Sequence, residues 1–232
     1  MTVSGSPGSL HVRLVILIAL LVFPVAQVVS LDTDPTLAGE FWVELDPFIR
    51  TEETYPLERE EAHTRILEEA RYVFSGIIYG YSFVYTPYDS RREVEEIFAI
   101  DAAATIPWGD PALTIAETRL QGNLLFALVR YTPADHQLRW IRMMESNIYD
   151  NATGTGSSDL FKGAAEKYGA IEEAVKGAIR EYLRPRILNK PKEVTGKISL
   201  TDVPYIIIDA GKYAAKVSVR IDVDEIVPYR VY

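Results

Sequence analysis

Two stretches of the chain repeat apolar residues at helical spacing, and we expect them to form its principal helices. The first covers residues 56–76, with Pro56 placed in the first turn. The second begins at Ser158 or Asp159, either of which can cap a helix, and Pro185 ends it. Because each carries a continuous apolar stripe, both helices should pack against the rest of the fold.

Alternation with a period of two marks the expected strands. The most distinct covers residues 77–86, where the odd-numbered positions are large and mostly aromatic and the even-numbered ones are smaller. We expect a hairpin that turns at Gly122 and Asn123. Further strands are expected within residues 40–45, 96–106, 136–146, 194–200, 205–209 and 213–226, although the second and third of these ranges could also contain helix.

The expected strands follow the helices in runs, twice along the chain, instead of alternating with them one by one. That order is typical of an α+β fold with mainly antiparallel sheet and two principal amphipathic helices. We expect a tether with a possible short strand over residues 31–55, followed by one α+β domain over residues 56–232 or by two small lobes. In the second case the linker would be residues 146–158, which are polar, contain glycine and lack periodicity.

The N-terminus has the order of a secretory signal peptide, which we expect over residues 1–30. A basic start precedes an apolar run over residues 14–23, and small residues follow as far as Ser30. The run is shorter than the roughly 20 residues of a membrane span. We expect cleavage after Ser30 or after Ala26, and the alternative is a retained anchor over residues 14–29.

The composition indicates the compartment in which the protein is expected. The chain has 232 residues, of which 48% are hydrophobic and 25% are charged, as in an ordinary globular protein. It contains no cysteine, so it can form no disulfide and carry no thioether-linked lipid. We therefore expect a soluble periplasmic or secreted bacterial protein that is not a lipoprotein.

The net charge argues against some classes of partner. Loss of the signal would remove Arg13 and no acid, which leaves 23 basic and 33 acidic residues and a formal charge of −10. Binding to phosphate backbones needs positive charge, so nucleic acid is not an expected partner. The same excess of acid argues against general adhesion to anionic lipid, and we expect no stable membrane insertion after signal cleavage.

Residues that could carry catalysis are sparse, and we expect no catalytic residue, no metal site and no cofactor. The chain has neither a cysteine nor a Gly-x-Ser-x-Gly motif, and only His63 and His136 would remain after signal cleavage. Glu60 and His63 are spaced like two ligands on one helix face, but a di-iron bundle needs that pair twice. Asp222 and Asp224 share a strand face and could hold calcium, although alternating charge on an exposed sheet also explains them.

Two local features are candidates for contact with a partner. The first is the aromatic strand, with Tyr79, Tyr81 and Tyr85, although aromatic stripes also fill cores. The second is the basic segment after the second helix, although cations there also complement the negative end of a helix. The cations of this segment that we single out are Arg184, Arg186, Lys190 and Lys192. Tyrosine and arginine are frequent anchors of protein interfaces.

The sequence GKYAAKVSVRI, residues 211–221 in the last third of the chain, follows a helix and further strands. This order resembles small α+β modules of exported bacterial envelope and flagellar accessory proteins, and no site residue is carried over from them. We expect an exported, non-catalytic protein that binds or assembles with another cell-envelope component, either a protein or a glycan. The alternatives are a soluble periplasmic protein that binds glycan or peptide, and a hydrolase that uses two carboxylates.

Overall fold

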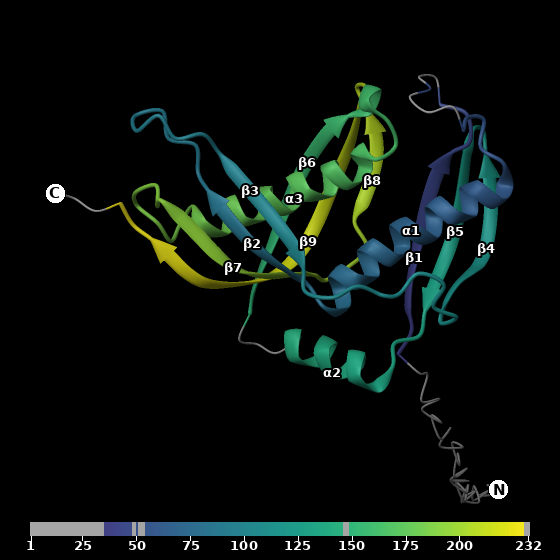
Figure 1. The fold of residues 1–232 in the computed structure, drawn as a ribbon, viewed down its shortest axis with the longest axis horizontal. Helices are drawn as coiled ribbons and strands as arrows, with labels where there is room; N and C mark the ends of the chain where they lie inside the picture. Colours follow the sequence, from purple (N-terminus) through teal and green to yellow (C-terminus); the bar gives the residue numbers. More distant parts are fainter. Residues whose placement is uncertain (1–34, 48–49, 51–53, 146–148, 230–232) are drawn as a thin grey trace, which may run out of the picture. The chain divides into compact units, whose positions relative to one another are not determined.

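A computed structural model of the chain describes residues 35–47, 50, 54–145 and 149–229 (Figure 1). Residues Asp34–Tyr232 form one compact unit. The expected signal peptide and its cleavage sites lie outside the described residues. The fold is α+β with antiparallel sheets, as the order of elements predicts.

The smaller sheet has three antiparallel strands in the order β1-β5-β4. The strands are β1 (Leu37–Glu44), β5 (Leu124–Tyr131) and β4 (Leu113–Gln121). The hairpin of β4 and β5 turns at Gly122. Its φ is 60°, a conformation that glycine adopts without the strain that a Cβ would cause. β1 lies in the segment expected to be a tether with a possible short strand. It is an edge strand because it pairs only with β5, and Phe41 and Val43 anchor it in the core.

The larger sheet has six strands, again all antiparallel. The order is β3-β2-β7-β9-β6. β8 pairs with the first part of β9, on the same side of β9 as β7. The strands are β2 (Tyr81–Thr86), β3 (Ile97–Ala102), β6 (Asp150–Asp159), β7 (Glu193–Leu200), β8 (Tyr205–Asp209) and β9 (Lys212–Val227).

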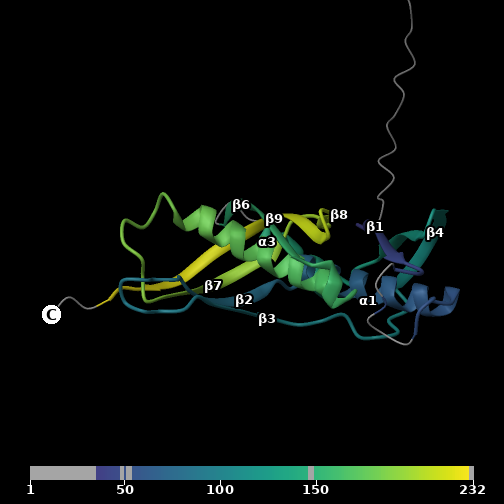
Figure 2. The same ribbon diagram turned by 90° about the horizontal axis from the view of Figure 1, so that it is seen from above.

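The described residues contain three α-helices. The helices are α1 (Arg59–Ile78), α2 (Asp135–Met144) and α3 (Glu166–Leu183), and the short 3-10 turn η1 (Leu160–Lys162) precedes α3. α1 and α3 pack on the sheets, and α2 packs on α1. Figure 2 shows α3 along one face of the larger sheet. α1 packs on the smaller sheet, where the ring of Phe74 meets Phe41 edge-on at 5.6 Å and stacks on Tyr131 at 6.4 Å between ring centroids.

The segment expected to be a linker contains strand β6 instead. Gly154 and Gly156 lie so close to α3 that an added Cβ would come within 2.1 Å of Ala174 O and 2.2 Å of Ala174 N, respectively. The two glycines therefore let the helix backbone pack onto the strand, and Thr155 between them faces solvent. β6 pairs along its whole length with β9.

Two other expected boundaries are corrected. Residues 135–144 form helix α2, the alternative to the strand favoured there, and Gln137 Oε1 accepts a hydrogen bond from the N–H of Ala134 at its start. α1 does not end at Gly76 but continues to Ile78, and the glycine makes room for the ring of Tyr81, which a Cβ at this position would meet. The aromatic strand therefore begins only after Gly80, whose φ is 71°.

Candidate functional site

The tyrosines expected to contact a partner lie mostly inside the fold. Tyr81 is 4% exposed and packs on Tyr72 of α1 at 5.8 Å between ring centroids, and burial raises its pKa. Tyr85 is 5% exposed, and its hydroxyl accepts a hydrogen bond from Arg180 of α3. Tyr79 is half-buried. The structure thus places Tyr81 and Tyr85 in the core and not on a contact surface.

The four cations of the basic segment are exposed after the end of α3. Three of them have partners: Arg184 pairs with Glu181 at 2.7 Å, Arg186 with Asp150 at 3.1 Å, and Lys190 donates to the carbonyl oxygen of Tyr88 at 2.6 Å. Lys192 follows on the way to β7. These residues remain candidates for partner contact, but the structure does not bring them together with the buried tyrosines into one surface.

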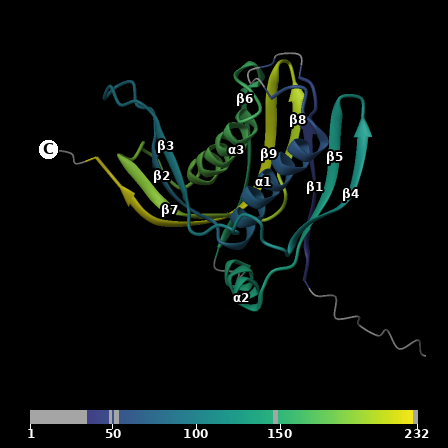
Figure 3. The ribbon, with the colours of Figure 1, turned by 45° about the vertical axis from the view of Figure 1, so that its right-hand side comes forward.

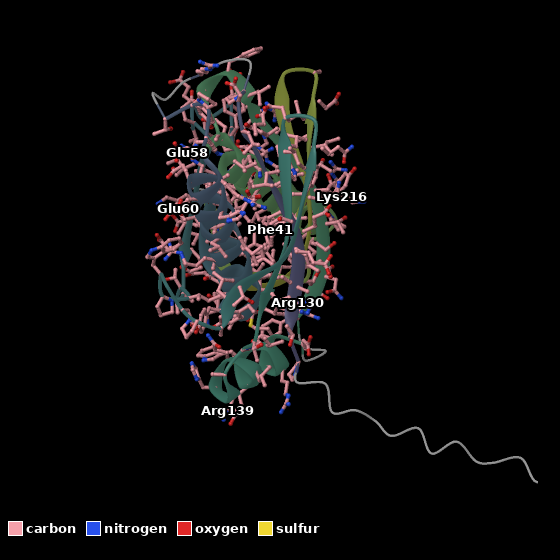
Figure 4. The ribbon with its side chains drawn as sticks, turned by 90° about the vertical axis from the view of Figure 1, so that its right-hand side faces the viewer. Phe41, Glu58, Glu60, Arg130, Arg139 and Lys216 are labelled. Carbon is pink, nitrogen blue, oxygen red and sulfur yellow. The ribbon has the colours of Figure 1, made fainter. Side chains whose placement is uncertain are left out.

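A groove of about 520 Å³ lies where β1 comes beside β8 (Figure 3). Its lining is mainly apolar and comes from residues 40–42 of β1, from β5, from Val73 of α1 and from residues 203–208. The indole N–H of Trp42 donates to the carbonyl oxygen of Ile206 at 3.2 Å across this groove. Figure 4 shows Phe41, the neighbour of Trp42 in β1, within the fold.

The backbone of β8 directs hydrogen-bonding groups toward the same groove, and the carbonyl oxygen of Ile206 among them already accepts from Trp42. β8 and β9 join through a two-residue turn at Ala210 and Gly211, both of which have positive φ. In such a hairpin the residues flanking the turn bond each other, and every second residue does the same. The backbone N–H and C=O groups of Ile207 therefore bond β9, whereas those of Ile206 and Ile208 point away from it. Within the described residues, no strand pairs with that side of β8.

The side chains of this edge are also unusual. Tyr205 is 67% exposed, and Ile207 and Ile208 are 40% and 39% exposed. Edge strands usually carry charge, proline or a covering element that prevents pairing with another chain. β8 has a single charged residue, Asp209, at its turn. An apolar edge with free backbone groups is suited to pair with a further strand.

A buried ion pair supports the floor of the groove. Glu69 of α1 and Lys167 of α3 are 7% and 5% exposed, and their side chains form an ion pair. Lys167 Nζ also donates to the carbonyl oxygen of Trp42 at 2.7 Å and lies 4.1 Å from the centre of its ring. The pair therefore fixes the residue whose indole reaches β8.

Sequence periodicity located β8 but did not identify it as a site. The only signal in the sequence was four consecutive apolar residues, Tyr205 to Ile208, where a half-exposed strand should alternate. Trp42 gave no signal of its own. Within the described residues, no group of three or more histidine or acidic side chains could hold a metal ion. The helices that the structure describes include none long and apolar enough to cross a bilayer.

Comparison with known proteins yields two matches and one absence. A protein-family model matches residues 26–229, and its description names no activity. A protein of Treponema pallidum (strain Nichols), described as uncharacterized, is 27% identical over 208 residues, which cover 86% of this chain and 87% of that protein. No solved structure gives a significant match.

Proposed function

We propose that this chain, which belongs to the protein family whose model matches residues 26–229, is an exported protein without catalytic activity that binds another cell-envelope protein. An extended segment of the partner adds as a strand to the free side of β8. The signal-like order of the N-terminal sequence supports export.

The observation that carries this proposal is the unpaired, apolar edge of β8. Its outward N–H and C=O groups at Ile206 and Ile208 lie beside a groove that is open to solvent and lined mainly by apolar side chains. Strand addition draws affinity from such backbone groups and specificity from the pockets that alternate side chains fill. The groove supplies room for these alternate side chains, with Trp42 and Phe126 in its lining.

The lining also indicates the kind of segment that fits. Val73, Pro204 and Ile206 line the groove together with Trp42 and Phe126, so apolar side chains at every second position of a bound strand would be buried. The two acids of the lining are already paired: Glu40 with Arg119 at 2.9 Å, and Glu69 with Lys167. We therefore expect alternating apolar residues and no requirement for charge in the bound segment.

The test is a selection from a library of random linear peptides displayed on phage, with the immobilised protein as the target. Two variants provide the comparison. Ile208→Pro removes an N–H that points away from β9, which an edge strand tolerates, whereas Ile208→Val keeps the N–H and most of the side chain. Peptides selected on the unmodified protein should lose at least about tenfold in affinity for Ile208→Pro and change little for Ile208→Val.

The fold of both variants is checked by circular dichroism and thermal unfolding. Equal affinity of the selected peptides for the proline and valine variants would contradict strand addition at β8. Enrichment of peptides without alternating apolar residues would contradict the described role of the groove.

A further inference from the structure

Two of the three tryptophans in the chain are exposed at one end of the fold. Trp108 is 54% exposed in the connection between β3 and β4, and Trp140 is 46% exposed on α2. Hydrogen bonds join these two elements. The hydroxyl of Tyr131 lies 3.3 Å from Asp110 Oδ2 and accepts from Gln137 Nε2 of α2 at 2.8 Å. These hydrogen bonds tie the connection to the helix.

Helix α2 carries an exposed apolar flank beside its buried side. Its inward side chains are Gln137 and Met144, which are buried. Trp140 and Met143 lie on the flank next to this side at a spacing of three residues, so they are neighbours on the helix surface, and Met143 is 45% exposed. Single exposed apolar residues are ordinary, but a tryptophan beside a methionine on one helix face forms a patch.

Arginines lie near this patch. Arg139 and Arg142 belong to α2, and Arg130 precedes Tyr131 at the end of β5; Figure 4 labels Arg130 and Arg139. Within the described part of the chain, none of the three has an ion-pair partner. We refer to α2 together with residues 107–110 as the tryptophan end.

The first residues of β1 lie at the tryptophan end as well. Leu37 pairs with Tyr131, and α2 begins at Asp135, only a few residues after that pair. The chain that precedes β1 carries the apolar run 14–23, and the residues between this run and Leu37 can span at most about 50 Å. A bilayer that held the run, during export or afterwards, would thus have the tryptophan end within reach.

We propose that the tryptophan end rests on the surface of a lipid bilayer. Trp108, Trp140 and Met143 lie among the lipid head groups, and the arginines of α2 contact lipid phosphates. Tryptophan favours this layer because its ring is apolar while its N–H still finds a polar partner. A short helix with arginines beside tryptophan lies in the plane of the interface and does not cross the bilayer.

The charge of the molecule sets the orientation and strength of this contact. The chain carries a formal net charge of −9, so an anionic bilayer repels most of its surface. The end with unpaired arginines is the part that can approach lipid phosphates. The contact is therefore peripheral, weak and oriented, and it leaves the groove between β1 and β8 available, because the proposal uses none of its residues.

The experiment measures vesicle binding by residues 31–232, which keep the compact unit whole and leave out the apolar run, whose own affinity for lipid would obscure the result. Vesicles contain phosphatidylcholine alone or with phosphatidylglycerol, and some carry brominated acyl chains. In a Trp42→Phe background, only Trp108 and Trp140 emit. We expect a blue shift of their fluorescence and quenching by the brominated lipid.

The variant with Trp108→Ser and Trp140→Ser should bind about tenfold more weakly in sedimentation with vesicles. Leu120→Ser is the matched control, because Leu120 is an exposed apolar residue, at 64%, on β4. It should bind like the parent. Circular dichroism confirms that each variant is folded. Absence of vesicle binding, equal binding by the double tryptophan variant, or an equal loss in Leu120→Ser would overturn the proposal. Capture of a protein by a photo-crosslinker at position 140, without any vesicle binding, would assign this surface to a protein partner.

Discussion

Trp42 connects the interior of the fold with the free edge of β8. Its carbonyl oxygen accepts a hydrogen bond from Lys167, its ring lies 6.2 Å from that of Tyr213, and its indole N–H donates to Ile206. That last bond occupies the carbonyl oxygen that an added strand would use. Trp42 therefore competes with a bound peptide for one acceptor on β8.

Replacement of Trp42 by phenylalanine tests this competition. The variant keeps an aromatic ring and loses the N–H, so the carbonyl oxygen of Ile206 becomes free for a peptide. A neutral hydrogen bond contributes about 1 kcal/mol, so a selected peptide should bind about fivefold more tightly. Fluorescence anisotropy with a labelled peptide measures the Kd, and Trp140→Phe is the control in which no change is expected. Weaker binding by Trp42→Phe would show that the indole N–H helps the peptide instead of competing with it.

Glu96 makes the free energy of unfolding depend on pH under acidic conditions. Its partial burial alone would raise its pKa, but hydrogen bonds from Arg180 and Tyr85 and the nearby charge of Lys176 outweigh that effect and lower it. A carboxylate with a lowered pKa in the folded state stabilises the fold above its unfolded pKa of about 4.5, and this stabilisation is lost as the pH falls through the folded value.

We therefore expect the free energy of unfolding to fall as the pH decreases from 5 towards 3, and to fall less steeply in Glu96→Gln. Chemical denaturation at several pH values measures the slope. Glu95→Gln, a change in the exposed neighbouring residue, serves as the control and should keep the slope of the parent. An unchanged slope in Glu96→Gln would mean that Glu96 does not titrate as described.

At the scale of elements, β6 and α3 show how a polar, glycine-containing sequence becomes an ordered strand. Propensity and periodicity over residues 150–159 predict no strand, because those patterns report on the local chain. The strand forms because β9 supplies its hydrogen bonds and α3 needs small residues beneath it. The stabilising partners are distant in sequence, and single-segment patterns cannot include them.

Gly154 provides the test of this packing. A side chain at position 154 would come within 2.3 Å of Ala178 N in α3, so Gly154→Val should destabilise the fold by about 3 kcal/mol or more. Urea denaturation measures the change. Thr155→Val places the same residue at the next position of β6, where the native side chain is exposed, and should change stability little. Similar stability of both variants would contradict close packing of α3 on β6.

The remaining elements differ in how far the sequence predicts them. Amphipathic stripes longer than two turns predict α1 and α3, and strict alternation predicts β9, whose inward residues from Tyr213 to Ile221 are buried. Short elements with mixed patterns are less distinct, and α2 was expected as a strand for that reason. The large aromatic residues of β2 fit both a core and a contact surface, and only tertiary packing decides between them.

At the scale of the whole molecule, the candidate site depends on which strands are edges. The sequence predicts that residues 205–209 form a strand. It does not predict that β9 pairs with β6 on one side and with both β7 and β8 on the other, which leaves the far side of β8 open. Nor does it predict that β1, about 160 residues earlier, brings Trp42 to the same groove. Such pairings depend on contacts between distant segments.

The central claim is that an extended segment pairs with β8, and amide hydrogen exchange resolved by residue tests it most directly. The N–H groups of Ile206 and Ile208 point away from β9, whereas that of Ile207 points toward it. On addition of a peptide selected from the library, exchange at Ile206 and Ile208 should slow by at least tenfold, in proportion to the occupancy of the site. Exchange at Ile207, which β9 already protects, should change much less. Binding of the peptide without protection of Ile206 and Ile208 would contradict the account.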